Sequence, residues 1–260
     1  HHPGGKVQAA DGAITDWESF ETYRWPSASQ LNVERMQQTA ALAPEGMGVW
    51  TGGPAPFQVT MDELLGFERL ALPTFADPDL VRAVADKVGA IMIEVVDLCC
   101  SLPFIDGFNF SGDMGHKTGT MLSPDTMREY FLPWHQRTVE AAHRHGKKIV
   151  LHSCGNLAAI MPDIVAYGFD GKHSFEDTIE PGIVELNAQY GDRIALLGGI
   201  DVDFLCRASE AQIRQRARDF IDTLAPNRGY CLGSGNSIPD YVPIEKYWAM
   251  LDEGLNYGRG

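Results

Sequence analysis

Short runs of consecutive apolar residues alternate with longer segments of helical periodicity through most of this chain of 260 residues. Ile149–Leu151 and Ile194–Leu197 are typical of these runs. Strands that are apolar on both faces belong to parallel sheets that helices cover on both sides. The pattern therefore predicts an α/β fold with a parallel sheet. Six strands are predicted at residues 47–51, 107–111, 148–153, 171–175, 194–198 and 229–233.

The segments between these runs carry the start signals of helices. Residues 78–98 repeat apolar side chains at helical spacing, and Asp77 and Pro78 occupy the N-cap and the first helical position. Ser123 is the expected N-cap of a helix over residues 125–145. Further helices are predicted at residues 16–23, 30–43, 61–72, 181–190, 209–224 and 244–257, and one starts near residue 156.

Polar side chains, some in glycine-rich segments, follow directly after five of the predicted strands. In a barrel all these points fall on the carboxyl-terminal face, whereas a doubly wound sheet would not gather all five into one mouth. We therefore predict a TIM (β/α)₈-type barrel in which residues 1–260 form a single domain and residues 1–45 form an irregular N-terminal segment. The five clusters are Asp113/His116, His152/Cys154, His173/Glu176, Asp201/Asp203 and Ser234/Asn236.

Charge and cysteine content exclude several classes of partner and compartment. The formal net charge is −14, and an acidic surface repels phosphates, so we expect no nucleic acid and no membrane as partner. The five cysteines are odd in number and Cys99 and Cys100 are adjacent, unlike a disulfide framework. No apolar run reaches the ~18 residues of a membrane helix. These features predict a cytoplasmic protein with reduced thiols.

His152 and Cys154 stand two residues apart at a predicted strand end. Side chains at that spacing share one face of a strand. One imidazole and one thiolate on the same face form half of a tetrahedral zinc site, which acts as a Lewis acid. A buried cysteine beside a hydrogen-bonded histidine gives the same pattern, so the spacing alone leaves both interpretations open.

Titratable side chains at two other strand ends are further candidates. Asp113 follows a Ser-Gly pair, where it either caps the next turn or takes part in catalysis. His173 and Glu176 follow the strand after that of His152, so both are expected beside the metal pair.

The last two strand ends offer a pair of carboxylates and a glycine-rich segment. One of Asp201 and Asp203 is expected to cap a helix and the other to line the pocket. The segment Gly233–Asn236 either binds an anion through its backbone N–H groups or forms a plain turn. The candidate catalytic residues are thus Asp113, His173 and Asp201, and the candidate cofactor-binding residue is Asn236.

A set of ordered motifs resembles the uroporphyrinogen decarboxylase superfamily from about residue 46 to the end. The run His152–Asn156 is similar to the corrinoid-dependent methyltransferase branch. The Arg-rich N-terminal motif that binds substrate carboxylates in the decarboxylases has no match here. The motifs are Phe110–Gly115, Ser123–Pro124, Tyr130–Pro133, His152–Asn156 and Gly191–Ile194.

The resemblance implies a zinc ion at the barrel mouth, held by a His and a Cys of the fifth strand and a Cys of the eighth. His152 and Cys154 match the first two ligands. Cys231 lies about 16 Å along the strand from the third position, where this chain has Asn236, and that is too far for a ~2.3 Å Zn–S bond. We therefore expect Glu176, or else His173, as the third ligand.

The resemblance also implies a function. We expect a zinc-dependent methyltransferase that moves a methyl group between a small methylated compound, such as a methoxylated aromatic, and a corrinoid on a partner protein. A decarboxylase of a polyacid is the alternative enzyme, although it needs cationic clamps and the predicted mouth is rich in Asp, Glu and His.

A non-catalytic partner subunit is the alternative from another class. The first two barrel strands of the superfamily normally precede the matched region, so the chain is a shortened form, a fragment, or a subunit that another chain completes. A barrel without those strands has two unpaired edges, which natural proteins avoid. We therefore expect a homo-oligomer or a cover formed by residues 1–45.

Overall fold

The computed structural model describes residues 12–71, 77–227 and 229–257. The chain falls into two compact units. The first contains residues 1–113 and 122–149, and the second contains residues 114–121 and 150–260. That residues 1–260 form a single domain stays a prediction, because two compact units can belong to one domain.

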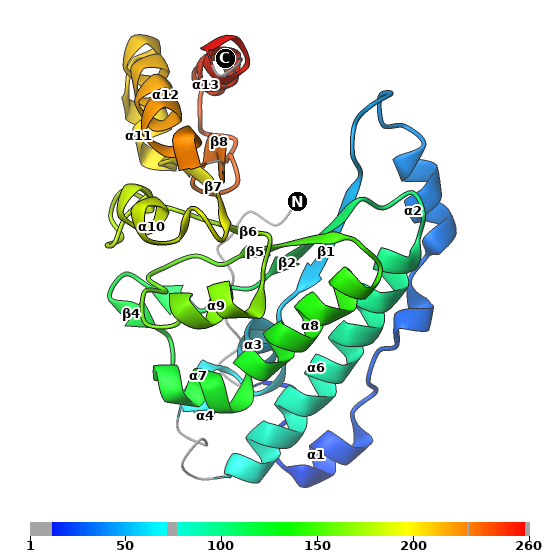
Figure 1. The fold of residues 1–260 in the computed structure, drawn as a ribbon. Helices are drawn as coiled ribbons and strands as arrows, with labels where there is room; N and C mark the ends of the chain where they lie inside the picture. The colour runs from blue at the N-terminus through cyan, green and yellow to red at the C-terminus, as the bar shows by residue number, and fades with distance from the viewer. Residues whose placement is uncertain (1–11, 72–76, 228, 258–260) are drawn as a thin grey trace. The chain divides into compact units, whose positions relative to one another are not determined.

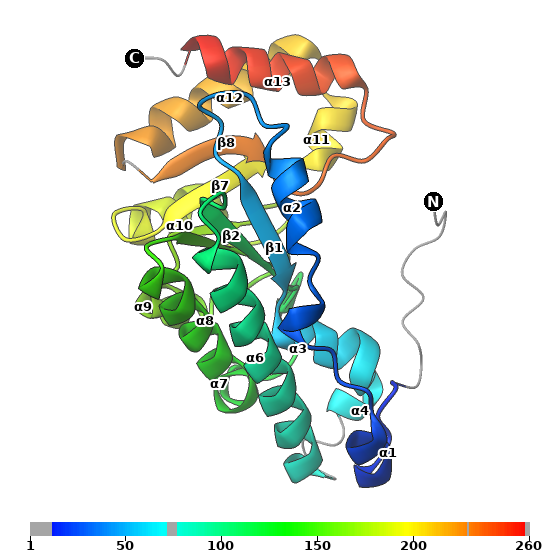
Figure 2. The same cartoon turned by 90° about the vertical axis from the view of Figure 1, so that its right-hand side faces the viewer.

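In the first unit, helices pack against a pair of parallel strands. β1 and β2 pair so that Trp50 lies opposite Gly107 and Pro54 lies opposite Ser111. Helices α6 and α8 lie side by side along this pair (Figures 1 and 2). The elements are α1 (Trp17–Thr22), η1 (Ala28–Gln30), α2 (Val33–Ala40), β1 (Trp50–Pro54), α3 (Pro56–Val59), η2 (Thr60–Leu64), α4 (Phe67–Ala71), α6 (Pro78–Ser101), β2 (Gly107–Ser111), α7 (Pro124–Tyr130) and α8 (Leu132–Arg144).

Two predicted helices of this unit are broken, each for a local reason. The helix predicted over residues 61–72 is wrong as a continuous element, because Gly66 has φ +78° and separates η2 from α4. The helix predicted over 125–145 ends at Tyr130 and restarts at Leu132. Pro133 lacks the N–H that a continuous helix needs at that position. The predicted caps are confirmed, since the side chains of Asp77 and Ser123 accept hydrogen bonds from the first turns.

The second unit has four neighbouring parallel strands, in the order β5, β6, β7, β8. His152 lies opposite His173 and Ile200 lies opposite Ser234, so the carboxyl ends of the strands meet along one edge. The elements are β3 (Gly115–His116), β4 (Gly119–Thr120), β5 (Lys148–His152), α9 (Met161–Tyr167), β6 (Gly171–His173), α10 (Ile183–Tyr190), β7 (Ala195–Ile200), α11 (Val202–Arg207), α12 (Glu210–Leu224), η3 (Ala225–Asn227), β8 (Tyr230–Ser234) and α13 (Ile244–Tyr257).

All six predicted strands form, and their exact bounds differ by a few residues. β1 begins at Trp50 rather than at residue 47, and β6 is only three residues long. Among the described residues, no helix combines the length and the apolar character that a membrane crossing requires.

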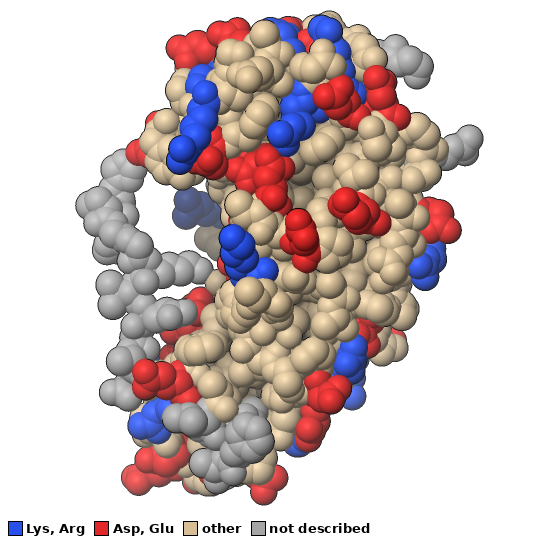
Figure 3. All heavy atoms as spheres, turned by 90° about the vertical axis from the view of Figure 1, so that its left-hand side faces the viewer, with Lys and Arg blue, Asp and Glu red and all other residues tan. Residues whose placement is uncertain are grey.

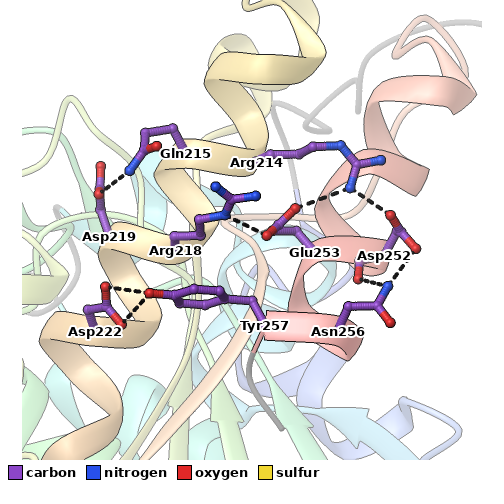
Figure 4. A network of polar contacts seen from close by, with 9 residues as sticks. All are labelled: Arg214, Gln215, Arg218, Asp219, Asp222, Asp252, Glu253, Asn256 and Tyr257. Atoms are coloured by element: carbon purple, nitrogen blue, oxygen red, sulfur yellow. Dashed lines mark hydrogen bonds and ion pairs between the residues drawn. The ribbon is translucent and has the colours of Figure 1, made fainter. Parts of the chain in front are cut away.

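An ion-pair network joins α12 to α13 in the second unit (Figure 4). The Glu253 side chain is only 8% exposed, and it receives hydrogen bonds from Arg218 Nε at 2.6 Å and Arg214 Nη1 at 3.2 Å. The Arg218 bond, followed by the Arg214 bond, lowers the pKa of the Glu253 carboxyl below its ordinary value. The network therefore holds α13 against α12, two helices whose residues Ala249, Met250 and Ile213 belong to one hydrophobic core.

Candidate metal centre

A tight turn after β5 positions the first two candidate ligands. Gly155 has φ +83°, and a Cβ on it would lie 2.2 Å from the carbonyl carbon of Gly115, so only glycine fits there. The hydroxyl of buried Ser153 accepts a hydrogen bond from the N–H of Met114 at 3.0 Å. These contacts fix the backbone on both sides of Cys154.

The side chains of His152 and Cys154 point to one location. Cys154 Sγ lies 3.8 Å from His152 Nε2. Two such ligands bound tetrahedrally to one zinc, at the usual Zn–N and Zn–S lengths, lie about 3.6 Å apart. The pair therefore fits two corners of a tetrahedral zinc site. The spacing of the two residues in the sequence suggested such a site but did not give this distance.

A chain of hydrogen bonds sets the tautomer of His152. His173 Nε2 lies 2.9 Å from the carbonyl oxygen of Ser234, which can only accept, so this nitrogen carries the proton. In a neutral His173 the Nδ1 atom is then an acceptor, and His152 Nδ1 donates to it at 2.7 Å. In this tautomer Nε2 of His152, which lies 3.8 Å from Cys154 Sγ, is the unprotonated nitrogen that metal ligation requires.

The neutral state of His173 has a physical cause. Burial lowers the pKa of its imidazole, and the nearby Lys172 ammonium acts in the same direction, against the hydrogen bond to Ser234. Lys172 is itself 3% exposed, donates to the carbonyl of Ser174, and lies 4.1 Å from the ring centre of Phe175. Lys172 is not among the residues predicted from the sequence, although a lysine inside a strand buried on both faces is a signal that could have identified it.

Asn236 completes the surroundings of the sulfur. Its Nδ2 atom donates to Cys154 Sγ at 3.2 Å, while its Oδ1 atom accepts from the N–H of Ser237 at 2.8 Å. The second contact fixes which end of the amide faces the thiol. An N–H donor at this distance stabilises a thiolate. Asn236, which the sequence analysis considered for cofactor binding, thus lies directly beside a candidate ligand.

Both carboxylate oxygens of Asp201 accept hydrogen bonds from backbone N–H groups. Its Oδ1 atom accepts from the N–H groups of Asp203 and Phe204 at 2.7 and 3.2 Å, and its Oδ2 atom accepts from the N–H of Asp177 at 3.0 Å. Asp201 is the N-cap of α11. One of Asp201 and Asp203 was predicted to cap a helix, and Asp201 is that residue. Its catalytic role stays a prediction.

Asp113 and Glu176 complete the predicted set. Asp113 is the last residue of the first unit before β3, and its N–H donates to Gln58 Oε1 at 3.2 Å. Glu176 lies in the loop between β6 and α10. The catalytic role of Asp113 and the metal-binding role of Glu176 stay predictions.

A cavity of about 870 Å³ opens beside the ends of β7 and β8 in the second unit, and its wall includes Asn236 and Asp201. Its volume is within the range of small-molecule sites. Phe204 and Tyr241 supply aromatic surface, and Arg207 is the one cation among the described lining residues. Figure 3 shows several acidic side chains exposed across the face of the molecule that carries α10. The acidic residues of the cavity wall are Glu176, Asp177, Asp201 and Asp203.

Comparison with known proteins identifies one family along nearly the whole chain. The family model described as uroporphyrinogen decarboxylase (URO-D) matches residues 15–256. A uroporphyrinogen decarboxylase of Thioalkalivibrio sulfidiphilus is 26% identical over 137 residues, which is 52% of this chain and 38% of that protein. A methylated-thiol–coenzyme M methyltransferase of Methanosarcina mazei is 27% identical over 168 residues, covering 64% of this chain and 43% of that protein. The matches thus span about two fifths of each relative.

Two further methyltransferases are similar. A methylcobamide:CoM methyltransferase of Methanosarcina barkeri is 29% identical over 136 residues, covering 50% of this chain and 36% of that protein. A solved methyltransferase from Methanosarcina mazei superposes with a TM-score of 0.70 at 20% identity, over 98% of this chain and 71% of that chain. This likeness and the family match confirm the predicted barrel-type α/β fold.

Proposed function

The chain belongs to the uroporphyrinogen decarboxylase family, and from this premise we propose that it is a zinc-dependent methyltransferase. The observation that carries the proposal is the convergence of His152 Nε2 and Cys154 Sγ at 3.8 Å, with the tautomer of His152 set by His173. A histidine nitrogen and a cysteine sulfur are the donors that zinc prefers. Glu176 is the proposed third ligand.

The chemistry follows from the donor set. Zinc at this pair would supply Lewis acidity to the oxygen, nitrogen or sulfur that bears the methyl group. Asn236 donates a hydrogen bond to the Cys154 sulfur, which would stabilise a zinc-bound thiolate, and His173 keeps the other ligand oriented. The cavity of about 870 Å³ would bind the methylated compound, with Phe204 and Tyr241 against an aromatic ring.

The second substrate would be a corrinoid on a partner protein. Support comes from relatives that are named as methyltransferases acting on a methylcobamide or on methylated thiols. In the proposed reaction the bond between the methyl group and its heteroatom would break, and a corrinoid reduced to Co(I) would supply the electron pair of the new bond to the methyl carbon. A proton would replace the methyl group on the leaving atom. Asp113 and Asp201 remain the proposed catalytic carboxylates.

The charges that line the cavity favour the methyltransferase over the alternative function, a decarboxylase of a polyacid. Four acidic residues and a single arginine among the described lining residues would repel a polycarboxylate. The partner-subunit alternative and the proposed homo-oligomer are tested together by size-exclusion chromatography with light scattering. A stable monomer would count against both.

Zinc analysis and a methyl-transfer assay test the proposal. The purified chain should bind about one zinc ion, and should transfer methyl groups from a methoxylated aromatic to reduced cobalamin only when zinc is present. Turnover of a porphyrinogen without methyl transfer would instead support the decarboxylase. Less than about a tenth of an equivalent of zinc, with no effect of added zinc, would refute the metal centre.

A further inference from the structure

A second cavity lies wholly inside the first unit, with a volume of about 200 Å³. It is lined by the segment that follows α1, by the η2 turn and by the middle of α6. Figures 1 and 2 show this segment running alongside α6. An engineered protein cavity of about 150 Å³ is already large enough to bind benzene. The space therefore suits a compact molecule of roughly six to ten non-hydrogen atoms.

One wall of this cavity is aromatic. Tyr23 and Trp25 both line it, and their rings meet edge to face, with centroids 4.8 Å apart and planes at 65°. Trp25 is also held edge to face by Phe20 at 5.5 Å, and Phe20 by Trp17 at 5.7 Å. This series fixes the orientation of the Trp25 ring without any contribution from a ligand. The electron-rich faces of such rings attract cations within about 6 Å.

The cavity is also lined by aliphatic side chains, and only one of its described lining residues is charged. Val88, Ile91 and Met92 of α6 supply apolar surface. Among the described residues that line the cavity, Glu63 is the only charged one. A carboxylate beside aromatic rings, with apolar walls around them, complements a ligand that is cationic and largely apolar. The net charge of −14 raises the local concentration of such cations further.

We propose that this cavity binds a small alkylated ammonium compound, such as a quaternary amine. Trp25 and Tyr23 would contact the alkyl groups of the cation, and Glu63 would neutralise its charge. This site goes beyond the proposed methyl transfer, since none of its residues belongs to the candidate metal centre, and binding to it requires no zinc.

Choline is the probe, and 3,3-dimethylbutan-1-ol is the matched control because it has the same shape without the charge. The protein contains five tryptophans, so labelling the indole nitrogens with ¹⁵N gives a separate NMR signal for each. Choline should shift the Trp25 signal with a dissociation constant on the order of 1 mM, and should leave that of Trp248 on α13 unchanged. The neutral alcohol should bind at least about fivefold more weakly.

Two substitutions separate the contributions. Trp25→Leu should abolish choline binding, whereas Glu63→Gln should weaken it by about fivefold and remove the preference over the neutral alcohol. Glu68→Gln, at an exposed position on α4 outside the cavity, is the matched control and should bind choline as the parent does. If Trp25→Leu fails to fold, Glu63→Gln alone decides the matter.

Three results would overturn the proposal. These are an unshifted Trp25 signal, equal binding of choline and the neutral alcohol, and equal losses in Glu63→Gln and Glu68→Gln. Zinc analysis of the same samples keeps this test independent of the metal centre, because choline binding is expected whether or not zinc is bound.

Discussion

Asn236 Nδ2 donates a hydrogen bond to Cys154 Sγ at 3.2 Å, across 82 residues of sequence. The family resemblance placed a zinc-binding cysteine where this chain has Asn236. The amide therefore stands in place of a second thiolate, beside the two candidate ligands His152 and Cys154. A donor in that position stabilises the sulfur anion but adds no negative charge of its own, so the proposed zinc ion would need a third ligand from elsewhere in the chain.

Replacing Cys154 by Ser should remove most of the bound zinc and leave the fold intact. A neutral hydroxyl is a poor zinc ligand, and Ser is close to Cys in size. Metal analysis and thermal melting measure the two effects separately. Retained zinc together with a loss of about 1–3 kcal/mol in stability would show instead that Cys154 is only a packed thiol.

Replacing Asn236 by Cys should tighten zinc binding by about tenfold or more, because a second thiolate is a stronger zinc ligand than an amide. Competition with a chromophoric chelator measures the affinity. Asn236→Ala is the matched control, since it removes the hydrogen bond to Cys154 without supplying a ligand, and it should bind zinc more weakly than the parent. Equal affinities in the two variants would contradict this geometry.

Replacing Glu253 by Gln should destabilise the second unit by about 1 kcal/mol at neutral pH, because Arg214 and Arg218 lose their shared charge partner. Folding lowers the pKa of Glu253 below 4.5. The stabilisation is therefore complete above that pH and is lost as the pH falls through the folded-state pKa. Denaturant unfolding at several pH values measures it.

The control for Glu253 is Asp219→Asn on α12, whose carboxylate accepts from Gln215 instead (Figure 4). It should change stability by less than about 0.5 kcal/mol. Equal effects of the two substitutions would mean that the buried ion pair contributes nothing specific.

His135 should make stability depend on pH in the first unit. Burial lowers the pKa of its imidazole to about 4, and the hydrogen bond between Nδ1 and the Phe131 carbonyl only partly opposes this. The unfolded chain binds a proton near pH 6.5 and the folded chain does not. As the pH is lowered from about 6.5 to 4, the free energy of unfolding should therefore decrease by up to about 3 kcal/mol.

The variant His135→Gln should lose this slope between pH 7 and 5, as measured by urea unfolding. His143→Gln, at an exposed position of the same helix, should keep it. If the free energy of unfolding of His135→Gln depends on pH as that of the parent does, other groups cause the pH dependence.

The sequence by itself determined those features that arise within a few neighbouring residues. Runs of consecutive apolar residues located all six strands, and the caps Asp77 and Ser123 start their helices as predicted. The spacing of His152 and Cys154 predicted that their side chains share one face of a strand, and the two side chains do meet. β5 ends at His152, however, so the turn at Gly155 positions Cys154.

Tertiary structure decided which distant residues meet. The register that sets His152 opposite His173 and brings Asn236 to Cys154 depends on how whole strands pair. Lys172 stands inside an apolar strand in the sequence, but only the folded chain shows that its side chain is 3% exposed. Glu176 and Asp201 stood at equally good positions in the sequence, yet only the folded backbone shows that both oxygens of Asp201 bind N–H groups. Strand pairing and packing act over tens of residues, and local patterns cannot fix them.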